Sequence, residues 1–248
     1  MMGATRESNP LYAKVELTLA SEIAAGVLPP RSQLPTEDRL IERFGVSRTT
    51  VRKAIENLVA RGLVEIRRGV GTFVAQPKII QELTELTGFV EDMQALGRTP
   101  TARLLDSQIV PADADVARQL AVSPGSLVMR IQRVRLADGL AMSFDETYLP
   151  RELGEKIVTH DLETEPIFAL LEERYRLPLI EAEYRLEAIT ATPTVAQALA
   201  VEPGNPIFLI ERTSYTEGSR PIDYERLHYR GDLIRFITRL SRRPRVRS

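Results

Sequence analysis

Residues 47–58 read SRTTVRKAIENL, and this stretch decides how the N-terminal part of the chain folds. Its apolar residues recur at the spacing of one buried helical face: Val51, Ala54, Ile55 and Leu58. Ser47 is a good N-cap, because its hydroxyl accepts a hydrogen bond from an unpaired amide of the first turn. The opposite face carries cationic and hydroxyl donors that suit phosphates and base edges in a DNA major groove. The same pattern also fits an ordinary amphipathic helix with a solvated face, so the neighbouring segments must distinguish the two.

The segments on either side complete a winged helix-turn-helix. Residues 36–44 fit a short helix, with Thr36 as its N-cap and Gly45 in the left-handed conformation that ends it. A turn at 45–47 then leads into the second helix. After that helix, residues 64–74 fit a small hairpin with a basic, glycine-rich tip at 67–71. Upstream, residues 11–25 fit a helix that packs behind these two.

Residues 11–75 resemble the winged helix-turn-helix of the GntR transcription regulators. The resemblance rests on LPTE at 34–37, FGVSRTTVR at 44–52, Leu58, Gly62-Leu63 and GVGTFV at 69–74. It implies DNA contacts from Thr36, Ser47, Arg48, Thr49, Thr50, Arg52, Lys53, Arg67, Arg68, Gly69 and Gly71.

This chain departs from the GntR pattern at one position. Many relatives carry a DNA-contacting arginine directly after the Pro-Ser/Thr-Glu motif, whereas this chain has Asp38 there, followed by Arg39. We therefore assign no such contact to Asp38 and retain Arg39 as a candidate substitute.

The composition of the 248 residues limits the class of protein. The apolar fraction of 43% supports a sizeable core in one large or two ordinary domains. No run approaches the length of a membrane span, and residues 1–10 lack the apolar core of a signal peptide. The absence of cysteine excludes disulfides, thiolate metal sites and a cysteine nucleophile. We expect a cytoplasmic protein that has no membrane partner.

The net charge of −1 hides an asymmetry along the chain. Residues 1–75 hold 11 Lys and Arg against 8 Asp and Glu, whereas residues 76–248 hold 22 against 26. From Arg43 to Phe73 the count is 7 against 2. A basic segment on an otherwise acidic chain is typical of a nucleic-acid-binding module, so double-stranded DNA is the expected partner of residues 1–75.

The chain beyond residue 75 divides into a linker, a second domain and a tail. Residues 76–88 are predicted to be a polar connector or short helix after Pro77. Residues 89–240 form the second domain, which contains an internal repeat at an offset of 79 positions. The matches include Val116 with Val195, Pro124 with Pro203, Arg133 with Arg212, Gly139 with Gly218, and Glu146 with Glu225. Residues 241–248 are a basic tail that we expect to be disordered.

Each copy of the repeat is predicted to hold a strand, a short helix, a Pro-Gly turn and a β-hairpin. The expected strands are 103–110, 127–136 and 141–149 in the first copy, and 182–190, 206–215 and 221–230 in the second. A helix near 166–171 joins the copies. The predicted fold class is α+β: an N-terminal winged helix-turn-helix followed by an α/β effector domain. Its sheet is mixed, mainly antiparallel and built from the two repeated units, and clefts between such halves are good ligand sites.

This second domain resembles the chorismate-lyase-like effector domain of the HutC-type branch of GntR regulators. The resemblance rests on RVRLADG at 133–139, ETYLP at 146–150 and YRGDLIRF at 229–236, and it extends from about 89 to 240. It implies a small anionic effector, either a carboxylate or a phosphate. The implied effector-binding residues are Gly88, Phe89, Arg133, Arg135, Glu146 and Tyr229.

The two arginines of this set support an anion site by their spacing. Arg133 and Arg135 alternate on one predicted strand, so both face the same side and can grip an anion in bidentate fashion. The alternative is a cross-strand salt-bridge ladder with Glu146, and Tyr229 also fits a core position. Glu183 and Arg212, on the repeat-related strands, are weaker candidates.

The two histidines do not support a metal site. His160 and His228 are too few and too far apart for a metal-binding motif, and we interpret both as ordinary surface or hydrogen-bonded residues. We expect no metal and no cofactor.

Three functions are compatible with these features. The first is a ligand-responsive transcription regulator, usually a repressor, acting as a homodimer on an inverted-repeat operator, because one winged helix contacts only a short half-site. The second is an enzyme, since the resembled fold includes a lyase of an aromatic dicarboxylate. A lyase needs no winged helix, however, and no paired acid and base with a defined motif is present. The third is a ligand-independent architectural DNA-binding protein, against which the long second domain argues.

Overall fold

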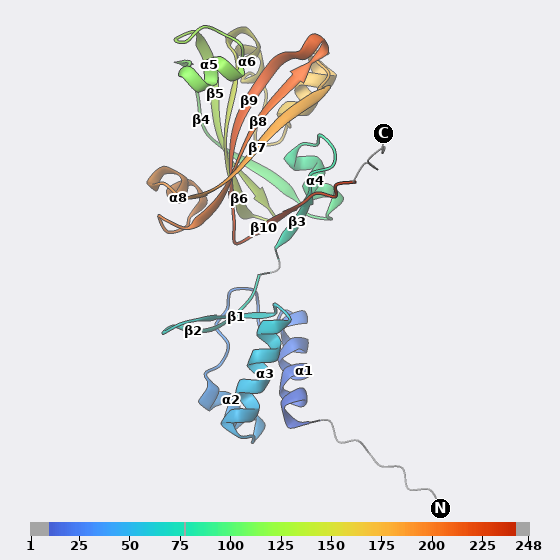
Figure 1. The fold of residues 1–248 in the computed structure, drawn as a ribbon, viewed down its shortest axis with the longest axis vertical. Coiled ribbons are helices and arrows are strands. Elements are labelled where there is room, and N and C mark those ends of the chain that lie inside the picture. Colours follow the sequence, from blue (N-terminus) through green and yellow to red (C-terminus); the bar gives the residue numbers. More distant parts are fainter. Residues whose placement is uncertain (1–9, 77, 242–248) are drawn as a thin grey trace, which may run out of the picture. The chain divides into compact units, whose positions relative to one another are not determined.

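The computed structural model describes residues 10–76 and 78–241, which form two compact units (Figure 1). The boundary between the units falls between Lys78 and Ile79. Within the described ranges, no helix has the length and apolar character needed to cross a membrane.

The first unit is the predicted winged helix-turn-helix. It comprises α1 (Leu11–Ala24), α2 (Glu37–Phe44), α3 (Arg48–Ala60), β1 (Val64–Arg67) and β2 (Gly71–Val74). Thr36 caps α2 by accepting a hydrogen bond from the amide of Arg39, and Ser47 caps α3 by accepting one from Thr50. Gly45 ends α2 in the left-handed conformation, at φ 62°. Gly45 and Ser47 therefore mark the two ends of the turn between α2 and α3.

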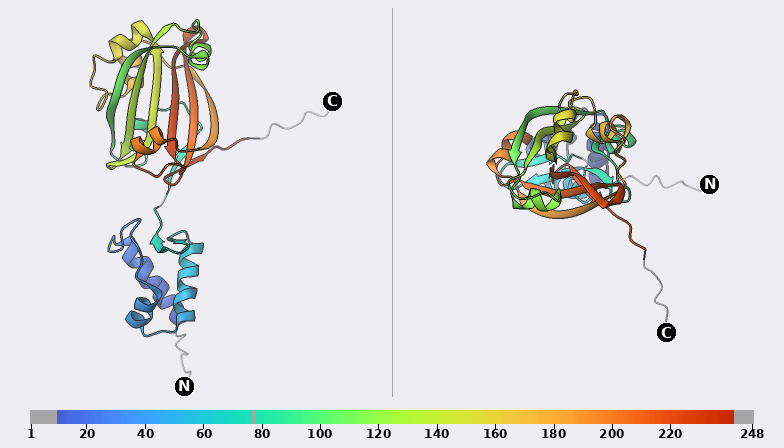
Figure 2. Two further views of the ribbon diagram at one scale, coloured as in Figure 1. Left: turned by 90° about the vertical axis from the view of Figure 1, so that its left-hand side faces the viewer. Right: turned by 90° about the horizontal axis from the view of Figure 1, so that it is seen from above.

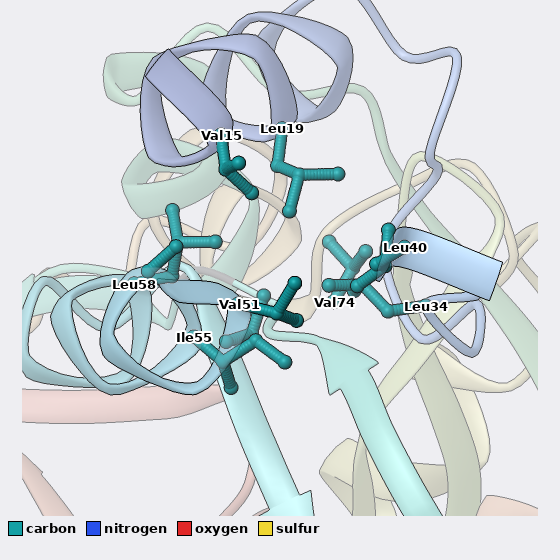
Figure 3. Close-up of a cluster of buried hydrophobic side chains, with 10 residues drawn as sticks. Val15, Leu19, Leu34, Leu40, Val51, Ile55, Leu58 and Val74 are labelled. Atoms are coloured by element: carbon teal, nitrogen blue, oxygen red, sulfur yellow. The ribbon is translucent and has the colours of Figure 1, made fainter. Parts of the chain in front are cut away.

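One apolar cluster holds the three helices and the wing together, as Figure 3 shows. It contains residues from every element of the unit: Val15, Leu19, Leu34, Leu40, Val51, Ala54, Ile55, Leu58, Val64 and Val74. The four apolar residues that predicted α3 are all buried there, so its polar residues lie on the outer face.

The second unit is built around a six-stranded antiparallel sheet in the order β4-β5-β6-β9-β8-β7 (Figure 2). Its strands are β4 (Pro100–Pro111), β5 (Leu127–Ala137), β6 (Leu140–Pro150), β7 (Glu181–Thr190), β8 (Pro206–Thr216) and β9 (Arg220–Arg230). Each begins and ends within a few residues of its predicted position. The prediction of one shared sheet is confirmed.

Helices cover both faces of this sheet. On one face, α5 (Ala114–Gln119) packs against Val128 and Tyr148, and α8 (Pro193–Leu199) packs against Val134 and Phe144. On the other face lie α4 (Phe89–Ala95), α6 (Arg151–Ile157) and α7 (Ile167–Ala169), which continues into a π-helical turn, η1 (Leu170–Arg174). The second face carries Arg133 and Arg135 of β5.

The two halves of the sheet repeat the same unit, with β6 and β9 paired at the centre. Asp113 and Thr192, which are 79 positions apart, each cap the following helix through a side-chain oxygen. A register shift after Arg135 recurs after Ser214, at the same offset. The repeat predicted from the sequence is therefore structural.

The register of the repeat changes at the second hairpin. In the first copy, two residues, Asp138 and Gly139, join β5 to β6, whereas a three-residue turn, η2 (Glu217–Ser219), joins β8 to β9. The extra residue moves the offset from 79 on β5 and β8 to 80 on β6 and β9. Accordingly, Asp145 pairs with Leu227, and Glu225 pairs with Thr147, as a two-fold axis requires.

The predicted connector contains a strand. β3 (Ile79–Glu82) pairs in parallel with β10 (Ile234–Ile237), so these residues belong to the second unit and form neither a free connector nor a short helix. The sequence pattern did not reveal this pairing, because both strands are four residues long and far apart in the chain. The predicted disordered tail lies outside the described residues except for Ser241.

Candidate functional site

The outer face of α3 presents the predicted DNA-contacting side chains to solvent. Arg48, Arg52 and Lys53 are all more than half exposed. Acidic residues of α2 lie against the two arginines: Arg48 Nη2 is 2.5 Å from Asp38 Oδ1, and Arg52 Nε donates to both carboxylate oxygens of Glu37. Acidic side chains of α2 thus restrain both arginines on the outer face of α3.

The hydroxyl groups at the start of α3 form a local network. Ser47 Oγ lies 2.8 Å from the hydroxyls of both Thr49 and Thr50, and it also caps the helix. Thr36 serves in the same way at α2. These residues hold the turn in place, and their predicted contacts to DNA stay predictions.

The wing places a basic tip beyond β1 and β2. Arg67 pairs with Glu65, and its guanidinium lies 4.4 Å from the ring centroid of Phe73. Arg68 is exposed at the turn, where Gly69 adopts φ 75°. Gly71 packs so closely on Gln33 that an added Cβ would clash with it. These contacts fix the hairpin and leave its tip exposed.

A polar pocket lies on the second face of the sheet in the effector unit. Four of the predicted effector residues line it: Gly88, Phe89, Arg135 and Tyr229. The structure adds further lining residues from β3, α4, α7 and the sheet: Gln81, Asp92, Asp145, Phe168, Tyr184, Arg212 and Glu225.

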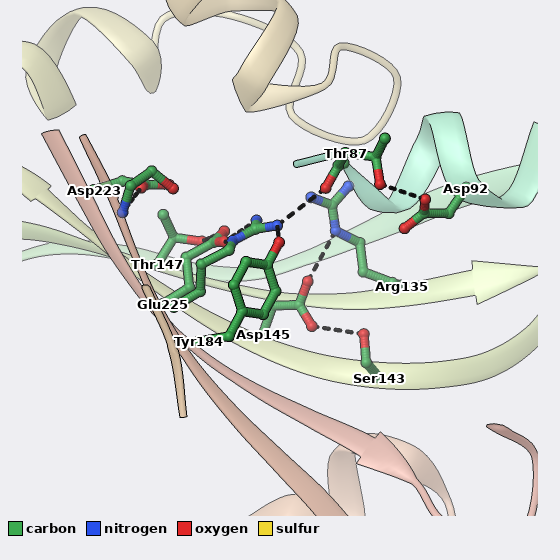
Figure 4. Close-up of polar contacts among 12 residues, drawn as sticks. Thr87, Asp92, Arg135, Ser143, Asp145, Thr147, Tyr184, Asp223 and Glu225 are labelled. Atoms are coloured by element: carbon green, nitrogen blue, oxygen red, sulfur yellow. Dashed lines mark hydrogen bonds and ion pairs between the residues drawn. The ribbon is translucent and has the colours of Figure 1, made fainter. Parts of the chain in front are cut away.

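Two buried ion pairs form the floor of this pocket (Figure 4). Arg135 Nε donates to Asp145 Oδ2 at 3.1 Å, and Asp145 also accepts from Ser143 at 2.6 Å. Arg212 donates through Nε and Nη2 to Glu225, while its Nη1 donates to the carbonyl of Thr87 and to Tyr184. Arg212 therefore has all three nitrogens engaged, whereas Arg135 bonds, among the described residues, through Nε alone.

Arg133 lies two positions before Arg135 on the same face and is completely buried. Its Nη1 reaches the carbonyl of Leu162 at 3.4 Å, but Nε and Nη2 have no partner among the described residues. Asp145, its neighbour across the strands, bonds to Arg135 instead. Burial, together with the nearby positive charge of Arg135, lowers the pKa of the Arg133 guanidinium to about 9, against the opposing charge of Asp145. Arg133 adjoins the pocket and does not line it.

The structure places Glu146 away from the pocket, which corrects our interpretation of its position. Its side chain lies on the opposite face of the sheet, where it accepts a hydrogen bond from Gln132. Glu146 matches Glu225 in sequence, but the extra residue in the second hairpin makes Asp145 the structural equivalent of Glu225. A shift of one residue moves a side chain to the other face of a sheet. The ion-pair partner of Arg135 is accordingly Asp145, and Glu146 does not take that role.

Of the two weaker candidates, one reaches the pocket. Arg212 lines it, whereas Glu183 is exposed and pairs with Arg185. Both histidines are hydrogen-bonded, His160 to Tyr175 and His228 to the carbonyl of Phe144. In the ranges that the structure describes, no group of three or more acidic or histidine residues could hold a metal ion.

A hydrogen-bonded chain joins the pocket to β3. The carbonyl of Thr87 accepts from Arg212, and its hydroxyl donates to Asp92 Oδ1 at 2.6 Å. Gln81 on β3 donates to Asp92 Oδ2, and Gln81 Oε1 is buried without a partner among the described residues. Burial raises the pKa of Asp92, against the hydrogen bond from Thr87. The carboxylate of Asp92 thus connects β3, at the beginning of the effector unit, to Thr87, which lines the pocket.

The sequence missed the acidic members of the pocket. Asp145 and Glu225 lie on β6 and β9, the paired central strands of the sheet, and which face they occupy depends on hairpin lengths and bulges that a pattern does not give. Asp145 lies directly across from Arg133 only because the register shifts between Arg135 and Leu136, so the hairpin at 138–139 alone could not have predicted this position.

Comparison with known proteins agrees with both units. Residues 11–74 match bacterial regulatory proteins of the gntR family, and residues 95–235 match the UTRA domain. The HTH-type transcriptional repressor NagR of Bacillus subtilis is 35% identical over 233 residues, covering 94% of this chain and 96% of NagR. The histidine utilization repressor of Pseudomonas putida is 30% identical, covering 94% of this chain and 93% of its own. The crystal structure of PhnF from Mycobacterium smegmatis has a TM-score of 0.65 at 27% identity, and the match covers 94% of this chain and 100% of PhnF.

A winged helix-turn-helix followed by a repeated α+β domain with a polar pocket defines a DNA-binding transcription regulator with an effector domain. The chain belongs to the GntR family, and its UTRA domain places it with the HutC-type regulators. These relatives are transcriptional regulators, so the lyase alternative is excluded.

Proposed function

We propose that this GntR-family repressor binds an inverted-repeat operator as a homodimer and that a small anionic metabolite in the effector pocket modulates this binding. The observation that carries the effector proposal is the state of Arg133 and Arg135 on β5. Arg133 has two buried donor atoms without a partner among the described residues, and Arg135 uses only Nε. Buried donors of this kind are costly, and an anion that accepts from them would offset the cost.

The surroundings of the arginines favour a ligand with an anionic group and a polar body. Asp145 and Glu225 already neutralise Arg135 and Arg212, which leaves the positive charge of Arg133 uncompensated by a direct ion pair among the described residues. Tyr184, Tyr229 and Phe168 supply ring faces and hydroxyls around them. Such a mixture suits a small metabolite bearing one carboxylate or phosphate.

The names of two relatives are consistent with a metabolite signal. One relative is the histidine utilization repressor of Pseudomonas putida, and another is the repressor of the mannosyl-D-glycerate transport/metabolism system in Escherichia coli. Both names concern small polar metabolites, and we extend only this general class to the present chain.

An effector changes DNA binding only if it favours one conformation over another. Arg212 donates a hydrogen bond to the carbonyl of Thr87, and the side chains of Thr87 and Gln81 both donate to Asp92. An anion that draws Arg212 toward itself would shift Thr87 and with it the chain of hydrogen bonds to β3. Since β3 begins directly after the DNA-binding unit, this chain is the proposed route of the signal.

The test begins with a thermal-shift screen of the full chain against sugar phosphates, urocanate, aromatic carboxylates and inorganic phosphate. Each compound that raises the Tm is then added to a titration of a DNA duplex that the protein has selected from a random library. We expect at least one anion to raise the Tm and to change the affinity for DNA by about 5- to 150-fold, the usual range of allosteric coupling.

Variants place the effect in the pocket. Arg135→Ala should abolish both the Tm shift and the change in DNA affinity, while DNA binding without ligand is unchanged. The matched control is Arg185→Ala, which removes an exposed arginine of β7 outside the pocket. An anion that acts equally on Arg135→Ala and on the wild type would refute the site.

A further inference from the structure

The carboxylate of Asp38 binds the guanidinium of Arg48 across the helix-turn-helix. Asp38 is the second residue of α2, and Arg48 is the first residue of α3. The separation between Arg48 Nη2 and Asp38 Oδ1 is 2.5 Å, and Arg48 Nη1 lies 3.9 Å from Glu37 Oε2. The amino-terminal ends of the two helices are therefore joined through one guanidinium.

Stability alone does not account for this pair. The side chains of Arg48 and Asp38 are 54% and 76% exposed, and ion pairs at such exposure contribute little to folding. Glu37 already supplies a negative charge at the positive end of the α2 dipole. On a surface that approaches DNA, a further carboxylate would repel phosphates unless it also served the contact.

The chemistry of the pair suits base reading. An arginine recognises guanine with two donors, directed at O6 and N7. Asp38 engages only Nη2 of Arg48, so the remaining donors stay available and their direction is restricted. A side chain whose rotamers are already limited loses less entropy on binding than a free one.

We propose that Asp38 is a specificity-determining residue that positions the Arg48 guanidinium for one base pair of the operator. Asp38 acts through Arg48, so the two residues form one reading unit. The proposal rests on the DNA contact predicted for Arg48 and is independent of the effector. It predicts that removing Asp38 broadens base preference at the position that Arg48 reads and leaves the other positions as they are.

The experiment is selection of DNA from a randomised duplex library by the full-length chain, followed by titration of the selected duplex and its single-base variants. The proteins are the wild type, Asp38→Asn, Asp38→Glu, Arg48→Ala and the double variant Asp38→Asn/Arg48→Ala. Glu42→Gln is the matched control, because Glu42 is an exposed acid on the same helix, α2. Thermal melting of each variant checks that the fold is retained.

We expect Asp38→Asn to reduce discrimination roughly tenfold at one base pair, within the range of a good arginine–base contact. Arg48→Ala should broaden the same position, the double variant should add nothing further, and Asp38→Glu should restore part of the preference. Glu42→Gln should change affinity for every duplex alike.

Three results would overturn the proposal. Asp38→Asn could strengthen binding to all duplexes equally, as Glu42→Gln does, which would show only a general charge effect. Asp38→Asn could alter a base position that Arg48→Ala leaves intact, which would show a contact independent of Arg48. Finally, Arg48→Ala could leave the selected sequence unchanged, which would remove the reading role on which the proposal rests.

Discussion

Gln81 on β3 donates a hydrogen bond to Asp92 on α4, and this contact ties the first strand of the effector unit to the helix that borders its pocket. Asp92 is shared, because Thr87 donates to its other oxygen and also binds Arg212 through its carbonyl. A change at Arg212 therefore reaches β3 through two side chains. The proposed coupling between ligand binding and DNA binding can therefore be tested at this contact.

We predict that Gln81→Leu uncouples the effector from DNA. Leucine removes the donor to Asp92 and also the buried Oε1, which has no partner among the described residues, so the fold should tolerate it. The anion found by thermal shift should still raise the Tm, but it should no longer alter DNA affinity. Glu82→Gln, an exposed change on the same strand, is the control. Full release of DNA by the Gln81 variant at wild-type effector concentrations would exclude this route.

Replacing Arg48 or Arg52 by alanine should weaken binding to the selected duplex by about 1–3 kcal/mol, the value of a bidentate arginine–guanine contact. Both side chains are exposed, so the Tm should stay within a degree or two of the wild type. Fluorescence anisotropy titration at fixed salt measures the affinity. Arg118→Ala, an exposed arginine in the effector unit, should bind DNA normally. If both α3 variants bind like the wild type, the assignment of α3 as the reading helix is wrong.

Arg133→Met should stabilise the protein and abolish the effector response. Methionine fills a similar volume without burying a charge whose donors are unpaired, and such replacements can stabilise by about 1–4 kcal/mol. Differential scanning calorimetry should show a higher Tm for the variant without ligand, and the anion should produce no further shift. A lower Tm would mean that Arg133 supports the fold, and an intact ligand shift would remove it from the effector site.

The homodimer predicted from operator geometry is checked by light scattering of the full chain at micromolar concentration, with and without the selected duplex. We expect the mass of two chains in free solution and a selected DNA sequence that reads as an inverted repeat. A monomer under both conditions would contradict this prediction.

Asp223 should make stability depend on pH near neutrality. Its carboxyl is wholly buried, and burial together with the neighbouring Glu225 raises its pKa to about 7, despite the opposing charge of Arg212. A group that binds its proton more tightly when folded destabilises the fold as pH rises from its unfolded value, about 4, through its folded value. Stability should therefore fall between about pH 4 and pH 7, and this loss should be complete above pH 8.

Asp223→Asn isolates this contribution. The amide oxygen can still accept from the backbone of Ser214, which now donates to Asp223 Oδ1 at 3.2 Å. The variant should have the higher Tm at pH 8, by about 2–4 °C per kcal/mol for a domain of this size, and the difference should vanish toward pH 4. Melting curves at several pH values measure it. A Tm difference that stays constant across this range would show that Asp223 does not titrate there.

The fold could be predicted largely because its periodicities are local. The capping signals at Thr36, Gly45 and Ser47 predicted α2 and α3, and the internal repeat with its Pro-Gly and hairpin turns predicted all six strands of the main sheet. The short strands β3 and β10 were missed, because four residues carry too little pattern and their pairing is set by the tertiary structure. Helix α6 was missed as well, since it directly follows β6 without a break in the chain.

The site was less accessible to prediction than the fold. Arg135 and Tyr229 were found through a family pattern, and the structure places both in the pocket. Glu146 was assigned through the same family pattern, but the structure places its side chain on the opposite face of the sheet, against Gln132. The hydrogen-bond partners of Arg212 come from β7, β9 and the segment before α4. These segments are far apart in the sequence, so no spacing of residues predicts that they lie together.

The parallel pairing of β3 with β10 also has a consequence for synthesis. Thr238, just after β10, donates to the carbonyl of Leu83, just after β3, and these residues are 155 positions apart in the chain. Domains fold as units during translation, beginning at the amino-terminal end. The DNA-binding unit can therefore fold on the ribosome long before β3, the strand that follows it, can pair with β10. A nascent or prematurely terminated chain that lacks β10 would carry a folded DNA-binding unit, but β3, which connects this unit to the effector unit, would still be unpaired.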